Sequence, residues 1–323
     1  MPVRDLLSYA ATVPSARMAG VVQTFAESSP VLEHLSFIDV GVAESYRYDI
    51  EGSLGGATWR ALGQTVTADS GVVNPAVESL SILTRIVQCD TQRANNPEYI
   101  ASKLRMGAKA CAAEYTRTFF DGDDAVNVKE MRGLNSRIGA SSALFRAIDA
   151  SKVDTNGGFM DKSLSIVKDM IDFVDGPAAD KRLIMSKRTR RLISDAVDLT
   201  GAGSFVRVQQ TGGDLAVNTL LRFFEDVEII VVEDDASGTE ILAHDETRGS
   251  DTTTASLYCV HFGRSEGEGV MGLHNAQGGT FATTKIGQVN TQIEWNIEGK
   301  VGMVNFHPRA IARMSGVKSA LSV

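Results

Sequence analysis

Hydrophobic and polar residues alternate along the segment from Ser45 to Gly71. The two alternating faces are Tyr46, Tyr48 and Ile50 on one side and Arg47, Asp49 and Glu51 on the other. A two-residue period is the pattern of a strand. The glycines of GSLGG (52–56) allow the chain to reverse, because glycine adopts positive φ without steric cost. The pattern predicts a long projecting hairpin with almost no core of its own, so something outside it must cover it.

A long amphipathic helix is predicted from Pro97 to Phe120. Asn95 or Asn96 can cap it, proline suits the first helical position, and Glu98 favours the positive end of the helix. The apolar residues recur at steps of three or four and form one stripe. They are Ile100, Leu104, Ala108, Cys111, Tyr115 and Phe119. Because the opposite face carries lysine and arginine, we expect this helix to lie on another layer and not to be buried all round.

Shorter elements surround the long helix. Before the hairpin, a helical pattern over 18–25 ends at SSP (28–30). The other predicted elements are helices over 161–175 and 187–201, a short helix beginning at Pro308, and strands over 77–90, 182–186, 227–234, 254–263, 269–274, 291–299 and 300–306. Gly201 suits the C-terminal end of the second of these helices. This order predicts an α+β fold, with a compact domain over 135–270 and a final group of strands that returns to the long helix.

Composition narrows the function classes. The chain has 323 residues, enough for about two domains. Its net charge of −8 argues against a surface that grips nucleic acid tightly. No apolar run is long enough to span a membrane, and the N-terminal residues do not have the apolar core of a secretory signal. Three cysteines stand far apart, which favours neither a zinc site nor a disulfide framework and fits folding in a reducing cytoplasm.

Motifs that could carry catalysis are few. Gly263-Arg264-Ser265-Glu266-Gly267 matches G-x-S-x-G, but a nucleophile needs a helix after the serine, and glycines and a strand follow here. His274 and His307 lie downstream, so a triad stays open on inventory alone, and a hairpin turn is the favoured interpretation. No residue is assigned as catalytic, and no metal-binding or cofactor-binding motif is found. GAGSFV (201–206) has only two of the three glycines of a dinucleotide site, and the acidic DGDD (121–124) and EDDASGTE (233–240) are interpreted as solvated loops.

Three further features bear on contacts. The basic stretch KRLIMSKRTRR (181–191) is interpreted as the solvated face of a helix beside a buried strand, with pairing between subunits as the alternative. Trp295 alternates with polar residues and is expected in the core. Trp59 lies on the projecting hairpin and is expected at an interface. The candidate inter-subunit contacts are Leu54, Gly55, Gly56, Trp59 and Arg60.

The ordered set of segments resembles the major capsid proteins of tailed bacteriophages, which have the Hong Kong 97 fold. SLGGATWRALGQTV (53–66) resembles the tip and return strand of that family's E-loop, and the helix from Pro97 resembles its spine helix. MRGLNSRI (131–138) resembles the F-x-G-L entry to the axial domain, with Met131 in place of the aromatic residue. RLIMSKRTRRLISDAV, SLYCVHFGRSEGEGVMGL and IEWNIEGKVGMVNFHPRAIARMSGV resemble later strands and helices of the fold.

The resemblance implies a domain plan. It consists of an N-terminal arm (1–36), an extended hairpin (37–76), a first part of the peripheral domain with the spine helix (77–134), an axial domain (135–270) and closing strands of the peripheral domain (271–323). It also implies that many copies form hexamers and pentamers of an icosahedral phage head, in which the hairpin lies over a neighbouring copy. Double-stranded DNA would fill the lumen, held weakly and without sequence preference.

The resemblance further implies a virion protein that assembles in the bacterial cytoplasm with a portal and, in some phages, a decoration or cement protein. Because only about 36 residues precede the hairpin, a separate scaffolding protein is expected. The first lysine is Lys103, so the hairpin lacks the amine that an isopeptide cross-link requires, and a non-covalent shell is expected. Two alternatives stay open: an encapsulin-type nanocompartment with the same fold, and, remotely, a serine hydrolase that uses Ser265.

Overall fold

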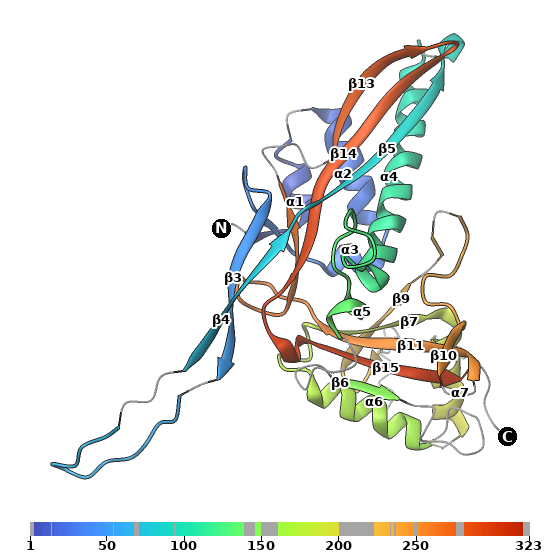
Figure 1. The fold of residues 1–323 in the computed structure, drawn as a ribbon. Helices are drawn as coiled ribbons and strands as arrows, with labels where there is room; N and C mark the ends of the chain where they lie inside the picture. Colours follow the sequence, from blue (N-terminus) through green and yellow to red (C-terminus); the bar gives the residue numbers. More distant parts are fainter. Residues whose placement is uncertain are drawn as a thin grey trace, which may run out of the picture.

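A computed structural model describes most of the chain. The described residues are 3–13, 15–53, 55–67, 71–93, 95–138, 146–149, 161–199, 223–232, 234–235, 237–248, 251–275 and 281–318. Leu54, Gly201 and the GAGSFV stretch (201–206) fall outside them. Figure 1 shows two sheets, a long helix along the first sheet, and a hairpin that extends far from both.

The first sheet surrounds the longest strand of the described chain. Its strands are β1 (Val3–Arg4), β2 (Phe37–Asp39), β12 (Val270–His274), β14 (Gln292–Asn305), β13 (Ala282–Val289) and β5 (Ser81–Asp90). They follow the order β1-β2-β12-β14-β13, and β5 pairs with β14 as well. The registers Ile293↔Cys89 and Ile293↔Gln288 place β5 and β13 on opposite sides of β14. Together these three strands form a long tongue beside α4 (Figure 1).

Helix α4 (Pro97–Asp121) confirms the predicted long helix. The Asn96 side chain accepts hydrogen bonds from the backbone N–H groups of Glu98 at 3.0 Å and Tyr99 at 3.3 Å, which makes it the N-cap. The predicted apolar stripe is buried along the whole helix. α1 (Leu6–Ala10), α2 (Ala16–Glu27) and α3 (Pro30–His34) form the N-terminal segment, and α2 packs against α4.

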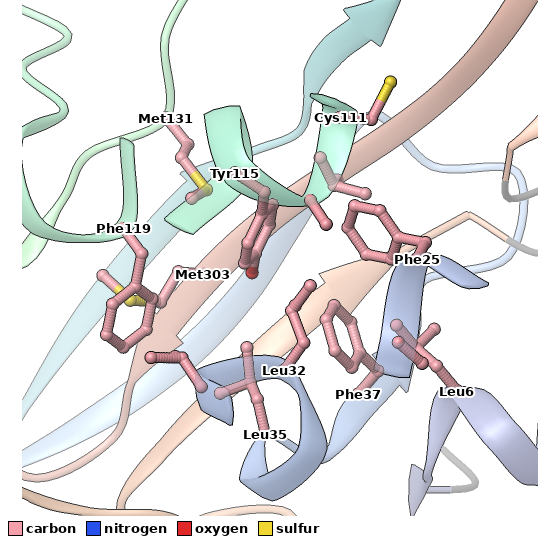
Figure 2. Packing of buried hydrophobic residues seen from close by; sticks show 14 of the residues in the cluster. Leu6, Phe25, Leu32, Leu35, Phe37, Cys111, Tyr115, Phe119, Met131 and Met303 are labelled. Atoms are coloured by element: carbon pink, nitrogen blue, oxygen red, sulfur yellow. The ribbon is translucent and has the colours of Figure 1, made fainter. Parts of the chain in front are cut away.

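The largest core cluster fills the space between these helices and the first sheet. In Figure 2, Phe25 of α2, Phe37 of β2 and Tyr115 of α4 point toward one another. The ring centroids of Phe25 and Tyr115 lie 5.9 Å apart in an edge-on arrangement, which favours aromatic pairs. The Tyr115 hydroxyl donates to the carbonyl of Gly302 at 3.1 Å, so its buried polar atom is satisfied. The N-terminal helices therefore complete the core under the long helix.

A second sheet forms the core of the other half of the body. Its strands are β6 (Arg146–Asp149), β15 (Ile311–Lys318), β11 (Asp251–His261), β7 (Lys181–Ser186), β9 (Val227–Val232) and β8 (Phe223–Phe224), with β10 (Glu246–Arg248) beside β11. The helices α6 (Asp161–Phe173) and α7 (Lys187–Leu199) accompany it, as the sequence predicts. Leu164, Val167, Met170 and Ile171 of α6 pack into the apolar cluster of this sheet.

Four elements at the C-terminal end differ from the predictions. The two strands expected over 291–306 form the single strand β14, and β13 was not predicted. The helix expected at Pro308 is one 3-10 turn, η3 (Pro308–Ala310), which leads into β15. β15 pairs with β11 and β6, so residues 311–318 join the second sheet and not the closing strands of the first. The physical reason is burial: Ile311, Ala312 and Met314 are fully buried between its neighbours.

A tight crossing links the two halves after α4. The backbone N–H of Gly133 donates to the carbonyl of Gly122 at 2.8 Å, and α5 (Leu134–Arg137) follows. A Cβ on Gly133 would lie 2.6 Å from the Thr118 carbonyl oxygen and 2.7 Å from the Gly122 nitrogen. Only glycine allows this approach, which gives the glycine of the MRGL motif a packing role.

The hairpin consists of β3 (Ser45–Ser53) and β4 (Val72–Ser79), and its register runs from Ser45↔Ser79 to Ser53↔Val72. It therefore begins later than residue 37, because β2 belongs to the first sheet. The reversal was predicted at GSLGG, and that position is wrong. The turn lies at Ala61–Gln64, where the Gln64 N–H donates to the Ala61 carbonyl at 3.1 Å and Gly63 has φ +84°. Gly55 and Gly56 lie on the way to this turn and have no regular structure.

Candidate assembly interface

Aromatic packing fixes the base of the hairpin to the body. Tyr46 and Tyr48 of β3 are stacked at 6.1 Å, and both rings meet Phe306 edge-on, at 6.1 and 5.3 Å. They belong to an apolar cluster with β2, β12 and the end of β14. The Tyr46 hydroxyl donates to Glu266 Oε1 at 2.5 Å. The alternating face recognised in the sequence is thus the face that packs on the body.

An ion pair beside these rings adds a charged contact. Arg137 Nη1 of α5 lies 2.6 Å from Glu78 Oε1 of β4, and both side chains are largely buried. The other end of the guanidinium donates to the Met303 carbonyl at 3.1 Å. The Tyr48 hydroxyl donates to Glu78 at 3.2 Å, and burial, followed by the Glu78 charge, raises the pKa of Tyr48 to about 12. The phenol therefore stays a donor at neutral pH and holds the carboxylate in place.

Glu78 and Arg137 are functional residues that were not predicted from the sequence. The two residues lie 59 positions apart, and nothing in the local pattern of either one links them. The available signal was a carboxylate at one of the few polar positions of a largely apolar strand. Its partner could be identified only from the fold.

Beyond its base the hairpin has no cover from its own chain. Trp59 and Leu62 are fully exposed, and Arg60 reaches only the Gln64 carbonyl, at 3.4 Å. Other large apolar residues of the hairpin are more than half exposed: Val66, Val72, Val73 and Val77. Gly55 and Gly56 are also exposed, and Leu54 lies outside the described residues. We call residues 55–67 the arm. An exposed apolar patch of this kind marks an interaction surface.

Trp295, expected in the core, is only partly buried beside it, and its partner was not foreseen. Its ring packs against the main cluster, and the Arg17 guanidinium of α2 stands 4.7 Å above it. The basic stretch 181–191 has a part that packs into the body and a part that stays on the surface. Lys181 is buried and donates to the Ile171 carbonyl at 3.0 Å, and Arg182 pairs with Glu228. The arginines of α7 remain on the surface, as predicted for the helical part.

The surroundings of Ser265 differ from those of a catalytic serine. It lies in a turn between β11 and β12, where the Glu268 N–H donates to the Ser265 carbonyl at 3.2 Å. The helix that a nucleophile elbow needs does not follow. His274 is buried against the rings of Tyr9 and Phe37, and burial lowers its pKa. The prediction of a turn at this position is therefore confirmed.

The acidic segments form loops held by their own backbone. Asp123 Oδ1 accepts the Ala125 N–H at 2.9 Å, and Asp235 Oδ1 accepts the N–H groups of Ser237 and Thr239 at 2.7 and 2.9 Å. Within the described part of the chain, no group of three or more His, Cys, Asp or Glu side chains could hold a metal ion. In the same residues, no helix has the length and apolarity to cross a membrane.

Comparison with protein families gives one match. The family model described as major capsid protein GP7 matches residues 13–168, which include α2, α3, the hairpin, β5 and α4. No curated protein sequence matches the chain.

Solved structures extend the likeness over the whole chain. The capsid of a native GTA particle is 12% identical with a TM-score of 0.61, and the match covers 91% of this chain and 90% of that one. The holo-SrpI encapsulin of Synechococcus elongatus PCC 7942 is 13% identical with a TM-score of 0.62, covering 100% and 99%. The procapsid of satellite phage P4 is 12% identical with a TM-score of 0.57, covering 95% and 93%. The fold is therefore the Hong Kong 97 capsid fold.

This fold, the capsid family match and the exposed hairpin agree on one class of protein, the structural subunit of a shell. Residues 13–168 match a major capsid protein family, and the fold of the whole chain is that of solved phage-type capsids.

Proposed function

We propose that copies of this chain form hexamers and pentamers, and that these close into an icosahedral phage head that encloses double-stranded DNA. The observation that carries the proposal is the hairpin, whose base is fixed by Tyr46, Tyr48 and Arg137 while Trp59 and Leu62 stand fully exposed. A two-stranded ribbon is marginal alone in water, so its apolar arm needs a neighbour. Each copy both gives an arm and receives one, which is a head-to-tail contact that closes into rings.

The proposed partners follow from charge and size. With a net charge of −8, the shell contains DNA without gripping it, because phosphates are repelled by an acidic wall. A separate scaffolding protein and a portal act during assembly in the host cytoplasm, and a cement protein is a further possible partner of the shell. The chain has a mechanical role and no reaction to catalyse.

We predict that the shell is non-covalent. A cross-link between subunits through an amide needs a lysine amine, and residues 1–102 contain no lysine, whereas Arg47 and Arg60 stay protonated at any working pH. Particles boiled in detergent and reductant should run as one band near 34.6 kDa on a denaturing gel. A ladder of multimers that survives this treatment would contradict the prediction.

Trp59→Ala should weaken assembly by about 2 kcal/mol or more per contact, as expected for a buried aromatic hot spot. It should leave the stability of the separate chain unchanged, because Trp59 touches nothing in its own chain. The measurement is the critical protein concentration for particle formation. Val42→Ala is the control, because Val42 is a large exposed residue outside the arm and should change nothing. An unchanged critical concentration for Trp59→Ala would place this residue in solvent in the particle.

A nanocompartment of the encapsulin type is the second candidate, favoured by the match to the SrpI encapsulin over the full length of both chains. The two functions differ in what fills the lumen. Particles purified from the natural source and treated with nuclease should retain double-stranded DNA if the chain forms a phage head. Protected protein cargo without DNA would favour the compartment.

A further inference from the structure

We propose that the arm of one copy inserts Trp59 into a pocket beside the start of β5 on a second copy. This inference rests on the proposed function and names the receiving site.

The pocket lies between β5, the last turns of α4 and the segment that follows α4, with a volume of about 230 Å³. Its lining residues are Ser81, Ile82, Leu83, Glu114, Tyr115, Thr118, Asn127, Lys129, Glu130, Met131 and Val301. Ile82 is more than half exposed, whereas Tyr115 and Met131 are buried beneath it. Buried apolar residues thus line the bottom of the pocket, and an exposed apolar residue lines one side. A pocket of this form can receive an aromatic side chain.

The occupant must come from another copy. The hairpin leaves the body at Tyr46 and Glu78 and extends away from both sheets (Figure 1), and its far end is fully exposed at Trp59 and Leu62. The same chain therefore offers both an uncovered aromatic residue and an unfilled apolar pocket that its own arm does not reach.

Hydrogen bonding favours this pairing as well. Arg60 is the only charged residue of the arm, which gives residues 55–67 a charge of +1. The pocket is lined by two carboxylates, Glu114 and Glu130, and one ammonium group, Lys129, and with the adjacent Arg117 these charges sum to zero. Both carboxylates contact Arg117, at 2.7 and 3.0 Å, but a carboxylate accepts about four hydrogen bonds and Glu114 is half-exposed. Insertion of Trp59 would therefore bring Arg60 close to the carboxylates of Glu114 and Glu130.

Cysteine cross-linking in assembled particles tests the proposal. The native cysteines, Cys89, Cys111 and Cys259, are all buried, so the background is low. The double variant Trp59→Cys/Ile82→Cys, assembled and mildly oxidised, should give a ladder of multimers on a non-reducing gel. Reduction should return the ladder to the single chain. Each single variant should give far less of it.

A matched control uses another exposed apolar residue. Met106 lines a wider groove of about 690 Å³ between α2 and α4, so Trp59→Cys/Met106→Cys should not form the ladder. Leu62→Cys/Ile82→Cys keeps Trp59 in place, so this pair should cross-link even where loss of the indole prevents the assembly of Trp59→Cys.

Electron microscopy of the same samples distinguishes failure of the proposed pocket from failure of the proposed shell function. Intact particles without cross-links to Ile82 in either pair, or with cross-links to Met106 instead, would overturn this pocket while the shell function stands. Absence of particles from the unmodified chain would overturn both.

Discussion

Removing the arm should abolish closed shells while the body stays folded. Because Ser53 and Val72 are paired, residues 54–71 can be replaced by Asn-Gly, which closes β3 and β4 with a tight turn. The arm contributes nothing to the core clusters of its own chain, so the circular dichroism spectrum and the unfolding midpoint of the body should change little. Assembly loses the contacts of Trp59 and Leu62 at every interface, and we expect no particles by electron microscopy.

The control for this variant keeps the arm at full length. Gln64→Ala removes a side chain that acts only within the arm, where its Oε1 accepts the Ala61 N–H at 3.1 Å. Particles should still form. Normal particles from the shortened chain would show that the hairpin is not an assembly element.

Removing the Arg137 side chain should have the largest effect of any point substitution discussed. Arg137→Met leaves the Glu78 carboxylate largely buried without its 2.6 Å partner and leaves the Met303 carbonyl without a donor. Breaking a buried ion pair in this way costs about 3–5 kcal/mol. Urea unfolding of the full chain, at one protein concentration for all variants, should show this loss in the free energy of unfolding.

Two controls isolate the cause. Arg117→Met breaks pairs with Glu114 and Glu130, which are both more exposed than Glu78, and should cost about 1 kcal/mol or less. Glu78→Met combined with Arg137→Met removes both charges and should recover most of the loss, because an apolar pair of similar volume avoids the uncompensated charge. Equal destabilisation by the single and double variants would show that the charge on Glu78 is not the reason.

The long helix could be predicted almost completely, because its signals are local. The cap at Asn96, the proline after it and the apolar stripe lie within one segment, and α4 ends one residue beyond the predicted end. The buried strand β9 was also readable, because both of its faces are covered and its apolar run is continuous.

Other features had no local signal. β13 lies at the edge of the tongue and is mostly exposed, so its residues show no buried face from which a strand could be predicted. The position of the turn was wrong because three glycines in GSLGG outweighed a single glycine at position 63, although the turn depends on Gly63. The Glu78–Arg137 contact and the pocket beside β5 depend on segments that only the fold brings together.

The most direct test of the account is electron microscopy of the purified full-length chain. We expect closed shells built from rings with fivefold and sixfold symmetry, in which density for each hairpin crosses onto the adjacent copy. A stable monomer at high protein concentration, with a hairpin that resists proteolysis, would contradict it.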